Sequence, residues 1–245
     1  MPRAARKTSA SGIYHIMLRG IDRQLIFEED EDYEKFLEIV ADCKEVSLFK
    51  LYAYCLMGNH AHLLIEIKFE GLEQIFKRIG AKYVHWFNWK YGRAGHLFQD
   101  RFKSEPVENT GYFLTVIRCI HQNPVKAQLS DSVEAYRWSS YKEYAGKRSI
   151  TDTSFALKMM PRDAFIKFNQ EANSDTCLEI QPPRLNDKEA KEKILKLLNC
   201  STTNEIKQLD ANERKQGIAR LKKAGLPIRQ ISRLTGISKA IVERA

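Results

Sequence analysis

Cysteine is scarce in this sequence, and its cysteines form no metal-binding or disulfide-rich pattern. The 245 residues include five cysteines, an odd number, spread widely and without a Cys-X-X-Cys pair: Cys43, Cys55, Cys119, Cys177 and Cys200. This spacing argues against a disulfide framework and against a cysteine zinc site. A bound metal ion would therefore need histidine, carboxylate or amide ligands.

Long apolar segments are also missing. The apolar runs, such as residues 61–65, are far too short to cross a bilayer. The basic residues 1–7 are not followed by the apolar stretch of a signal peptide. We therefore expect a cytoplasmic protein without a membrane partner.

Basic residues outnumber acidic ones, and the excess lies at one end of the chain. The totals of 40 Lys and Arg against 31 Asp and Glu give a net charge of +9. Residues 183–245 hold 15 against 7, a balance of +8, whereas residues 1–182 hold 25 against 24. A basic segment joined to a near-neutral one indicates a polyanionic partner, usually nucleic acid. A solvated lysine-rich surface has the same composition, so both interpretations stay open.

The hydrophobic pattern predicts a mixed first domain. Apolar runs bounded by turn residues predict strands over 13–19, 48–56, 61–67 and 98–107. Helical spacing predicts helices over 31–45, 72–89 and 111–122, the last stopped by Asn123-Pro124. The order β-α-β-β-α-β predicts a ferredoxin-like split βαβ domain, with an antiparallel four-stranded sheet and helices on one face. The expected fold class is α+β.

The rest of the chain predicts an extension and then an all-α domain. The aromatic-rich residues 130–146 are expected to pack on the first domain, and Gln181-Pro-Pro-Arg is the expected linker. Helices are predicted over 188–198, 213–223, 227–234 and 238–245. The predicted domains are 8–146, an extension over 147–182, and 183–245.

The last three of these helices resemble a helix-turn-helix unit. Its predicted core is Ile218, Leu221, Ile231, Leu234, Ile237 and Ile241. Ser238 and Lys239 would face the major groove of duplex DNA, with Arg229 and Arg233 on the backbone. A helical bundle that serves only for packing is the alternative.

A histidine pair is the central motif of the first domain. His60 and His62 are two residues apart on a predicted strand, so they share one face, with Ala61 turned into the core. Two imidazoles about 7 Å apart along a strand can converge on one divalent ion. Such pairs also occur on ordinary surfaces, and histidine-triad hydrolases use similar spacing, so the motif alone defines no function.

A second motif, Arg118-Cys-Ile-His-Gln-Asn-Pro-Val-Lys-Ala127, ends a predicted helix. Cys119 and Asn123 are four residues apart and project from one helix face. Together with the histidine pair, Gly95-His-Leu-Phe-Gln-Asp-Arg-Phe-Lys-Ser104 and Trp138-Ser-Ser-Tyr141, this motif resembles the REP-associated tyrosine transposases and related single-tyrosine HUH transposases. The resemblance covers residues 11–144.

The resemblance implies a metal-dependent nuclease. His60, His62 and Asn123 would bind Mg²⁺ or Mn²⁺, which would polarise the scissile phosphate for in-line attack. The family's nucleophile is a tyrosine four residues before the asparagine, and it would form a covalent 5′-phosphotyrosyl link. In this sequence that position holds Cys119.

Cys119 leaves three interpretations open. A thiolate is a strong nucleophile that the adjacent Arg118 could favour, but its side chain is several ångströms shorter than tyrosine. Alternatively, Cys119 has ended strand cleavage while DNA binding remains. Tyr112 is a possible substitute on nearly the same helix face, but roughly 10 Å away along the axis.

Nearby basic residues predict DNA contacts. Arg19, Arg101 and Lys103 are expected to neutralise phosphates of a single strand or hairpin. The sequence therefore predicts either a transposase-like enzyme that cuts and rejoins single-stranded, hairpin-end DNA, or a domesticated DNA-binding protein that does not cut. A homodimer is compatible with both.

Overall fold

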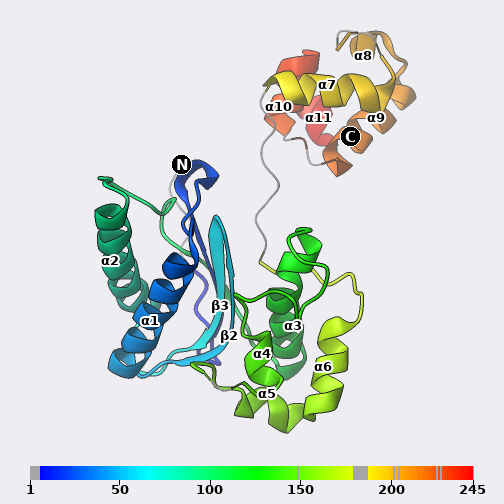
Figure 1. Ribbon diagram of the computed structural model, residues 1–245. Helices are drawn as coiled ribbons and strands as arrows, with labels where there is room; N and C mark the ends of the chain where they lie inside the picture. Colours follow the sequence, from blue (N-terminus) through cyan, green and yellow to red (C-terminus); the bar gives the residue numbers. More distant parts are fainter. Residues whose placement is uncertain are drawn as a thin grey trace. The chain divides into compact units, whose positions relative to one another are not determined.

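The computed structural model describes residues 6–147, 149–178, 187–200, 202–203, 205–224, 226 and 228–244 (Figure 1). The chain divides into two compact units, Met1–Glu179 and Ile180–Ala245, which we describe separately. No helix in the described ranges is long and apolar enough to cross a membrane. The predicted linker, residues 181–184, and Pro227 lie outside these ranges.

The first unit is built on an antiparallel sheet with the strand order β2-β3-β1-β4. Its strands are β1 (Ile13–Arg19), β2 (Lys50–Met57), β3 (His60–Glu66) and β4 (Lys103–Pro106). β4 is shorter than predicted, and Phe98 forms only an isolated bridge to Gly20. The backbone of Asp100 is left-handed, with φ of 56°, which interrupts the extended chain between Phe98 and β4.

Helices cover both faces of this sheet, so the prediction of one covered face is wrong. The helices of the unit are α1 (Asp30–Ser47), α2 (Leu72–Lys90), α3 (Thr110–Lys126), α4 (Tyr141–Tyr144), α5 (Ser154–Met159) and α6 (Arg162–Gln170). Tyr54 and Leu56 of β2 belong to the core under α1 and α2. Cys55 and Met57 belong to a second core under α3, on the opposite face (Figure 1). A strand buried on both faces has apolar residues at consecutive positions, as β2 does.

α3 continues one turn beyond its predicted end. The expected stop, Asn123-Pro124, lies inside the helix, which ends at Lys126. Pro124 lacks only its own backbone donor. The following amides keep partners, because Ala127 donates to the carbonyl oxygen of Asn123 and Leu129 to that of Pro124.

The aromatic segment 130–146 packs on the first unit, as predicted. Tyr144 donates a 2.7 Å hydrogen bond to the carbonyl oxygen of Tyr52 in β2 and stacks on Phe165 of α6. α6 itself comes from the predicted extension, residues 147–182. The described part of that extension thus contributes helices to the core under α3.

The second unit is helical in its described residues, as predicted. Its helices are α7 (Asp187–Leu198), α8 (Glu205–Gln208), α9 (Ala211–Lys223), α10 (Ile228–Thr235) and α11 (Lys239–Arg244). Ile241 is wrong as a core residue, because it is 45% exposed and Val242 is buried in its place. Because α11 begins at Lys239, its buried side faces the core at position 242 and not at position 241. The other predicted core residues lie in or against the core: Ile218, Leu221, Ile231, Leu234 and Ile237.

Asp32 ties the start of α1 to the end of α2. Its buried carboxylate accepts hydrogen bonds from the backbone amides of Glu28 (2.6 Å) and Glu29 (2.9 Å). The Tyr91 hydroxyl and the Lys90 ammonium each donate to it at 2.8 Å. Burial alone raises the pKa of this carboxyl, but Lys90 and the hydrogen bonds outweigh burial and lower the pKa below 3.8.

Replacing Asp32 by asparagine should lower the free energy of unfolding at pH 7 by about 2–3 kcal/mol, because charge-assisted hydrogen bonds are lost. A carboxyl whose folded pKa is lowered contributes stability that is present above its unfolded pKa and lost as pH falls through the folded value. The difference between wild type and Asp32→Asn should therefore shrink below pH 3.8. Urea unfolding from pH 7 to pH 2 measures it.

Asp42→Asn is the control for this prediction. Asp42 lies on the same helix, is exposed, and faces Lys82 at 3.4 Å. Its loss should change the free energy of unfolding by less than about 1 kcal/mol. Equal effects of the two substitutions, or an Asp32→Asn effect that does not change with pH, would contradict the role given to Asp32.

Candidate metal and nucleic-acid site

His60 and His62 lie on the sheet face that α3 covers. They alternate along β3 with Ala61 and Leu63, which belong to the core under α1 and α2. Leu64, on the same side as the histidines, belongs to the core under α3. The two imidazole centroids are 5.1 Å apart and their planes meet at 81°. The two rings therefore share one face, as the alternation of the strand predicts.

Each imidazole is held through Nδ1. His60 Nδ1 lies 2.6 Å from Asn59 Oδ1, and His62 Nδ1 lies 3.0 Å from His15 Nε2. Within the described residues, Nε2 of neither ring makes a hydrogen bond. Burial, with a contribution from Arg19, lowers the pKa of His60 to about 4. Burial also lowers the pKa of His62 well below 6.5. Both rings are neutral at neutral pH, the form that binds metal ions.

Two neutral imidazoles with free Nε2 atoms fit a divalent cation but do not complete its coordination. Among the described residues, no three histidine, cysteine or carboxylate side chains gather in a metal-binding arrangement. Asn123, the predicted third ligand, lies one turn after Cys119 on α3. Its carboxamide makes no hydrogen bond to the part of the chain that the structure describes, either imidazole included. Its role as a ligand therefore stays a prediction.

The three basic residues predicted to contact DNA in this domain gather beside the histidines. Arg19, Arg101 and Lys103 line one depression, together with Met17, Gln99 and Asp100. The strand register explains why, since Arg19 of β1 pairs with His60. Met17 pairs with His62 on one side and with Lys103 on the other. Cross-strand partners share a face, so cations and imidazoles lie on one surface.

Among the described residues, the cations of this depression form no buried ion pair. Arg19 Nε donates a 2.8 Å hydrogen bond to the neutral Gln99 Oε1. Arg101 pairs with Glu73 at 3.1 Å, but these side chains are 62% and 65% exposed. An exposed pair is worth roughly 0–1 kcal/mol, so a phosphate can compete for Arg101.

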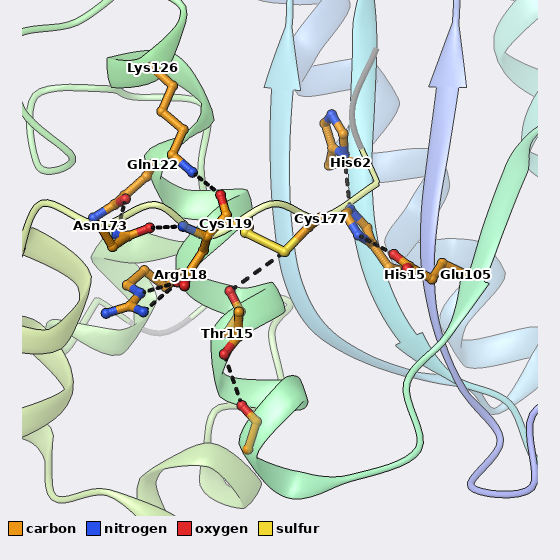
Figure 2. Close-up of a disulfide and its surroundings, with 12 residues drawn as sticks. His15, His62, Glu105, Thr115, Arg118, Cys119, Gln122, Lys126, Asn173 and Cys177 are labelled. Carbon is orange, nitrogen blue, oxygen red and sulfur yellow. Dashed lines mark hydrogen bonds and ion pairs between the residues drawn. A yellow bond between two sulfur atoms is a disulfide. The ribbon is translucent and has the colours of Figure 1, made fainter. Parts of the chain in front are cut away.

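Cys119 is bonded to Cys177, a single disulfide that the spacing of the cysteines did not predict (Figure 2). Their Cα atoms are 6.4 Å apart across a sequence separation of 58 residues. Spacing in the sequence could not reveal the bond, because it depends on α6 and the following segment running back along α3. A disulfide sulfur is not a thiolate. In this state Cys119 cannot attack a phosphate.

Residues 171–178, here called the strap, run along α3. Three α3 side chains hold the strap: Arg118 and Lys126 donate to Asp175, and Gln122 donates to the carbonyl oxygen of Glu171. Arg118 Nε lies 2.8 Å from the Asp175 carboxylate. This guanidinium therefore pairs with Asp175, and Cys119, whose thiolate it could have favoured, is in a disulfide.

Tyr112, the substitute nucleophile, is engaged with Glu105. Burial, then the charge of Glu105 and a hydrogen bond to it, raise the pKa of Tyr112 to about 12. Its hydroxyl stays protonated at neutral pH, which makes it a poor nucleophile.

His15 and Glu105 are site residues that sequence reasoning missed. His15 of β1 is fully buried beside His62, and Glu105 of β4 is its cross-strand partner. A single histidine among the mostly apolar residues of β1 was the available signal. His15 is two residues before Met17 and four before Arg19 on the same strand, so the three side chains point to one face of the sheet.

Comparisons with known proteins bear on this arrangement. A solved structure described as a REP-associated tyrosine transposase bound to a REP hairpin is 17% identical, with a TM-score of 0.51, over 62% of this chain and 94% of that one. At this identity the likeness shows the fold alone. A candidate transposase from Deinococcus radiodurans is 15% identical over 50% of this chain and 97% of that one, and its TM-score of 0.35 supports no argument.

No curated protein matches the chain. The family described as "Transposase IS200 like" matches residues 8–123. That segment holds β1 to β4 and most of α3, and therefore the histidine pair, the basic depression, Cys119 and Asn123. Residues 8–123 belong to the IS200-like transposase family.

Proposed function

We propose that this protein binds single-stranded or hairpin DNA on the sheet face that α3 covers, and that it does not cut DNA while Cys119 is in the disulfide. The observation that carries the proposal is the contrast within one site. The sulfur at the nucleophile position is bonded to Cys177, whereas Nε2 of both imidazoles makes no hydrogen bond to the described residues. The relative of similar fold is bound to a hairpin, which is why hairpin DNA is our first choice of ligand.

In this proposal the side chains have separate tasks. His60, His62 and Asn123 hold Mg²⁺ or Mn²⁺, which, when bound, polarises a phosphate oxygen. The depression beside them, with three cations and one carboxylate, neutralises neighbouring phosphates. Because Arg19 and Met17 of this depression are cross-strand partners of His60 and His62, one DNA strand can contact both groups.

Strand cleavage is the second candidate function, and the retained histidine pair favours it. A dithiol reductant would convert the disulfide into two thiols while its own thiols become a disulfide. The Cys119 thiolate would then attack phosphorus and displace the 3′-oxygen. This step would leave a 5′-phosphothioester on the protein and a free 3′-hydroxyl.

The second unit is proposed to bind duplex DNA through a helix-turn-helix. α10 and α11 are joined by a short turn at Gly236, which has a φ of 65°. The four residues predicted to contact DNA are all exposed: Arg229, Arg233, Ser238 and Lys239. Ile241, which is exposed, lines a depression with Arg214, Lys215 and Arg244, so this surface is also basic.

A cleavage assay tests the first proposal against the second. Incubated with end-labelled hairpin DNA and Mn²⁺, the oxidised wild type should bind DNA without a covalent adduct. Cys119→Tyr restores a hydroxyl of the family's length and should give cleavage and a DNA-linked band on a denaturing gel. Cys119→Phe, which also breaks the disulfide but has no hydroxyl, is the matched control and should give neither.

The same assay with dithiothreitol decides the second candidate. An adduct that forms only after reduction and disappears in Cys119→Ser would replace the non-cutting proposal with thiolate catalysis. Tyr112→Phe should leave every outcome unchanged, because its hydroxyl is held by Glu105.

Arg19→Ala and Lys103→Ala should each weaken hairpin binding and reduce the salt slope of log K by roughly 1, because each removes one phosphate contact. Fluorescence anisotropy at several NaCl concentrations measures both quantities. Lys35→Ala is the control, since Lys35 lies on α1, over the opposite face, and pairs with Glu38. An unchanged slope for Arg19→Ala and Lys103→Ala would remove the depression from the DNA site.

The double variant Arg229→Ala/Lys239→Ala should weaken binding to duplex DNA, because two phosphate or groove contacts are lost, and should spare binding to the hairpin loop. Separate anisotropy titrations with a duplex and a short-stem hairpin distinguish these effects. Equal duplex affinity for the variant and the wild type would contradict DNA binding by this helix-turn-helix and favour the alternative, a helical bundle that serves only for packing.

A further inference from the structure

A chain of polar groups lies behind His62 (Figure 2). His62 Nδ1 is 3.0 Å from His15 Nε2, and His15 Nδ1 faces Glu105 Oε2 at 4.0 Å. Three neighbouring strands supply these groups, β3, β1 and β4, and the register pairs His15 directly with Glu105. His15 is fully buried and His62 is 1% exposed, so water does not compete freely for either ring.

The positions of the protons follow from Glu105. Its Oε2 and His15 Nδ1 are both buried, have no hydrogen-bond partner among the described residues, and lie 4.0 Å apart. A carboxylate oxygen accepts hydrogen bonds, so the relay proposed below has the proton of His15 on Nδ1, facing Glu105. His15 Nε2 is then an acceptor, and His62 Nδ1 must be the donor to it. The lone pair of His62 is left on Nε2.

We propose that His15 and Glu105 form a relay that sets the tautomer and orientation of His62, so that His62 Nε2 is presented to the divalent cation. This inference rests on the proposed function, in which His62 is a metal ligand. His15 touches neither metal nor DNA in this account and is a positioning residue.

His60 provides an internal comparison. Its Nδ1 is held by Asn59 Oδ1 at 2.6 Å, and a carboxamide oxygen only accepts. His60 therefore also has its proton on Nδ1 and its lone pair on Nε2. The two neighbouring imidazoles have the same tautomer but different partners. Asn59, in the turn before β3, holds His60, and the buried relay holds His62. Outer partners of metal-binding histidines typically affect metal affinity by roughly 10–100-fold.

Manganese titrations followed by electron paramagnetic resonance test the relay without any DNA. His15→Leu, which has no acceptor for His62 Nδ1, should weaken Mn²⁺ binding by roughly 10–100-fold. His15→Gln, whose side-chain oxygen can accept that proton, should recover most of the loss. Tyr144→Phe is the matched control, because it removes a buried hydrogen bond on the same sheet but outside the histidine group, and its Mn²⁺ affinity should equal the wild type's.

Nitrogen NMR of the histidine rings in the metal-free wild type gives an independent readout. His62 should carry its proton on Nδ1, and His15→Leu should shift it toward Nε2. A wild-type His62 protonated on Nε2, or wild-type Mn²⁺ affinity in His15→Leu, would overturn the relay. If the wild type bound no Mn²⁺ at all, the metal site of the proposed function would be wrong, and the ring spectra would still decide the direction of the hydrogen bonds.

Discussion

The register of β1 against its two neighbours is the constraint on which the site depends. Successive side chains of a strand point to opposite faces, so a slip of one residue would exchange the faces of every side chain. His15, Met17 and Arg19 would then turn toward α1 and α2, away from the imidazoles of β3. The slip is resisted because Ile16 and Leu18, at the alternate positions, are buried in the core under those helices. Core packing on one face of the sheet thus determines which side chains lie beside the imidazoles on the other face.

The disulfide gives α3 a second role. In the family that this region belongs to, the position of Cys119 is expected to carry the nucleophile, but here it crosslinks α3 to the strap. Closing a loop of 58 residues is worth about 4 kcal/mol in the chain-entropy description. The strap also makes hydrogen bonds to α3, through Arg118, Gln122 and Lys126, so reduction alone does not remove every contact that holds it.

The sequence was sufficient for the features that depend on local pattern. Alternation placed His60 and His62 on one face, and apolar runs located the sheet strands and most helices. Features that depend on distant parts of the chain meeting were missed. Glu105 and His15 are 90 positions apart and meet only through the pairing of β1 with β4. Cys119 meets Cys177 only because α6 returns along α3. Consecutive apolar residues on both faces of β2 are the local sign of the second helical layer.

In the proposed function, DNA binding and strand cleavage would depend on different elements of this fold, except that the proposed ligand Asn123 shares α3 with Cys119. The imidazoles, their Nδ1 partners and the basic depression lie on strands or on the turns beside them, where the sheet fixes their positions. The nucleophile position lies on α3, a helix that packs over the sheet through apolar residues. A change at Cys119 therefore alters neither the strand register nor the cations. On the proposed function, DNA binding would therefore persist on the sheet even though α3 supplies no nucleophile.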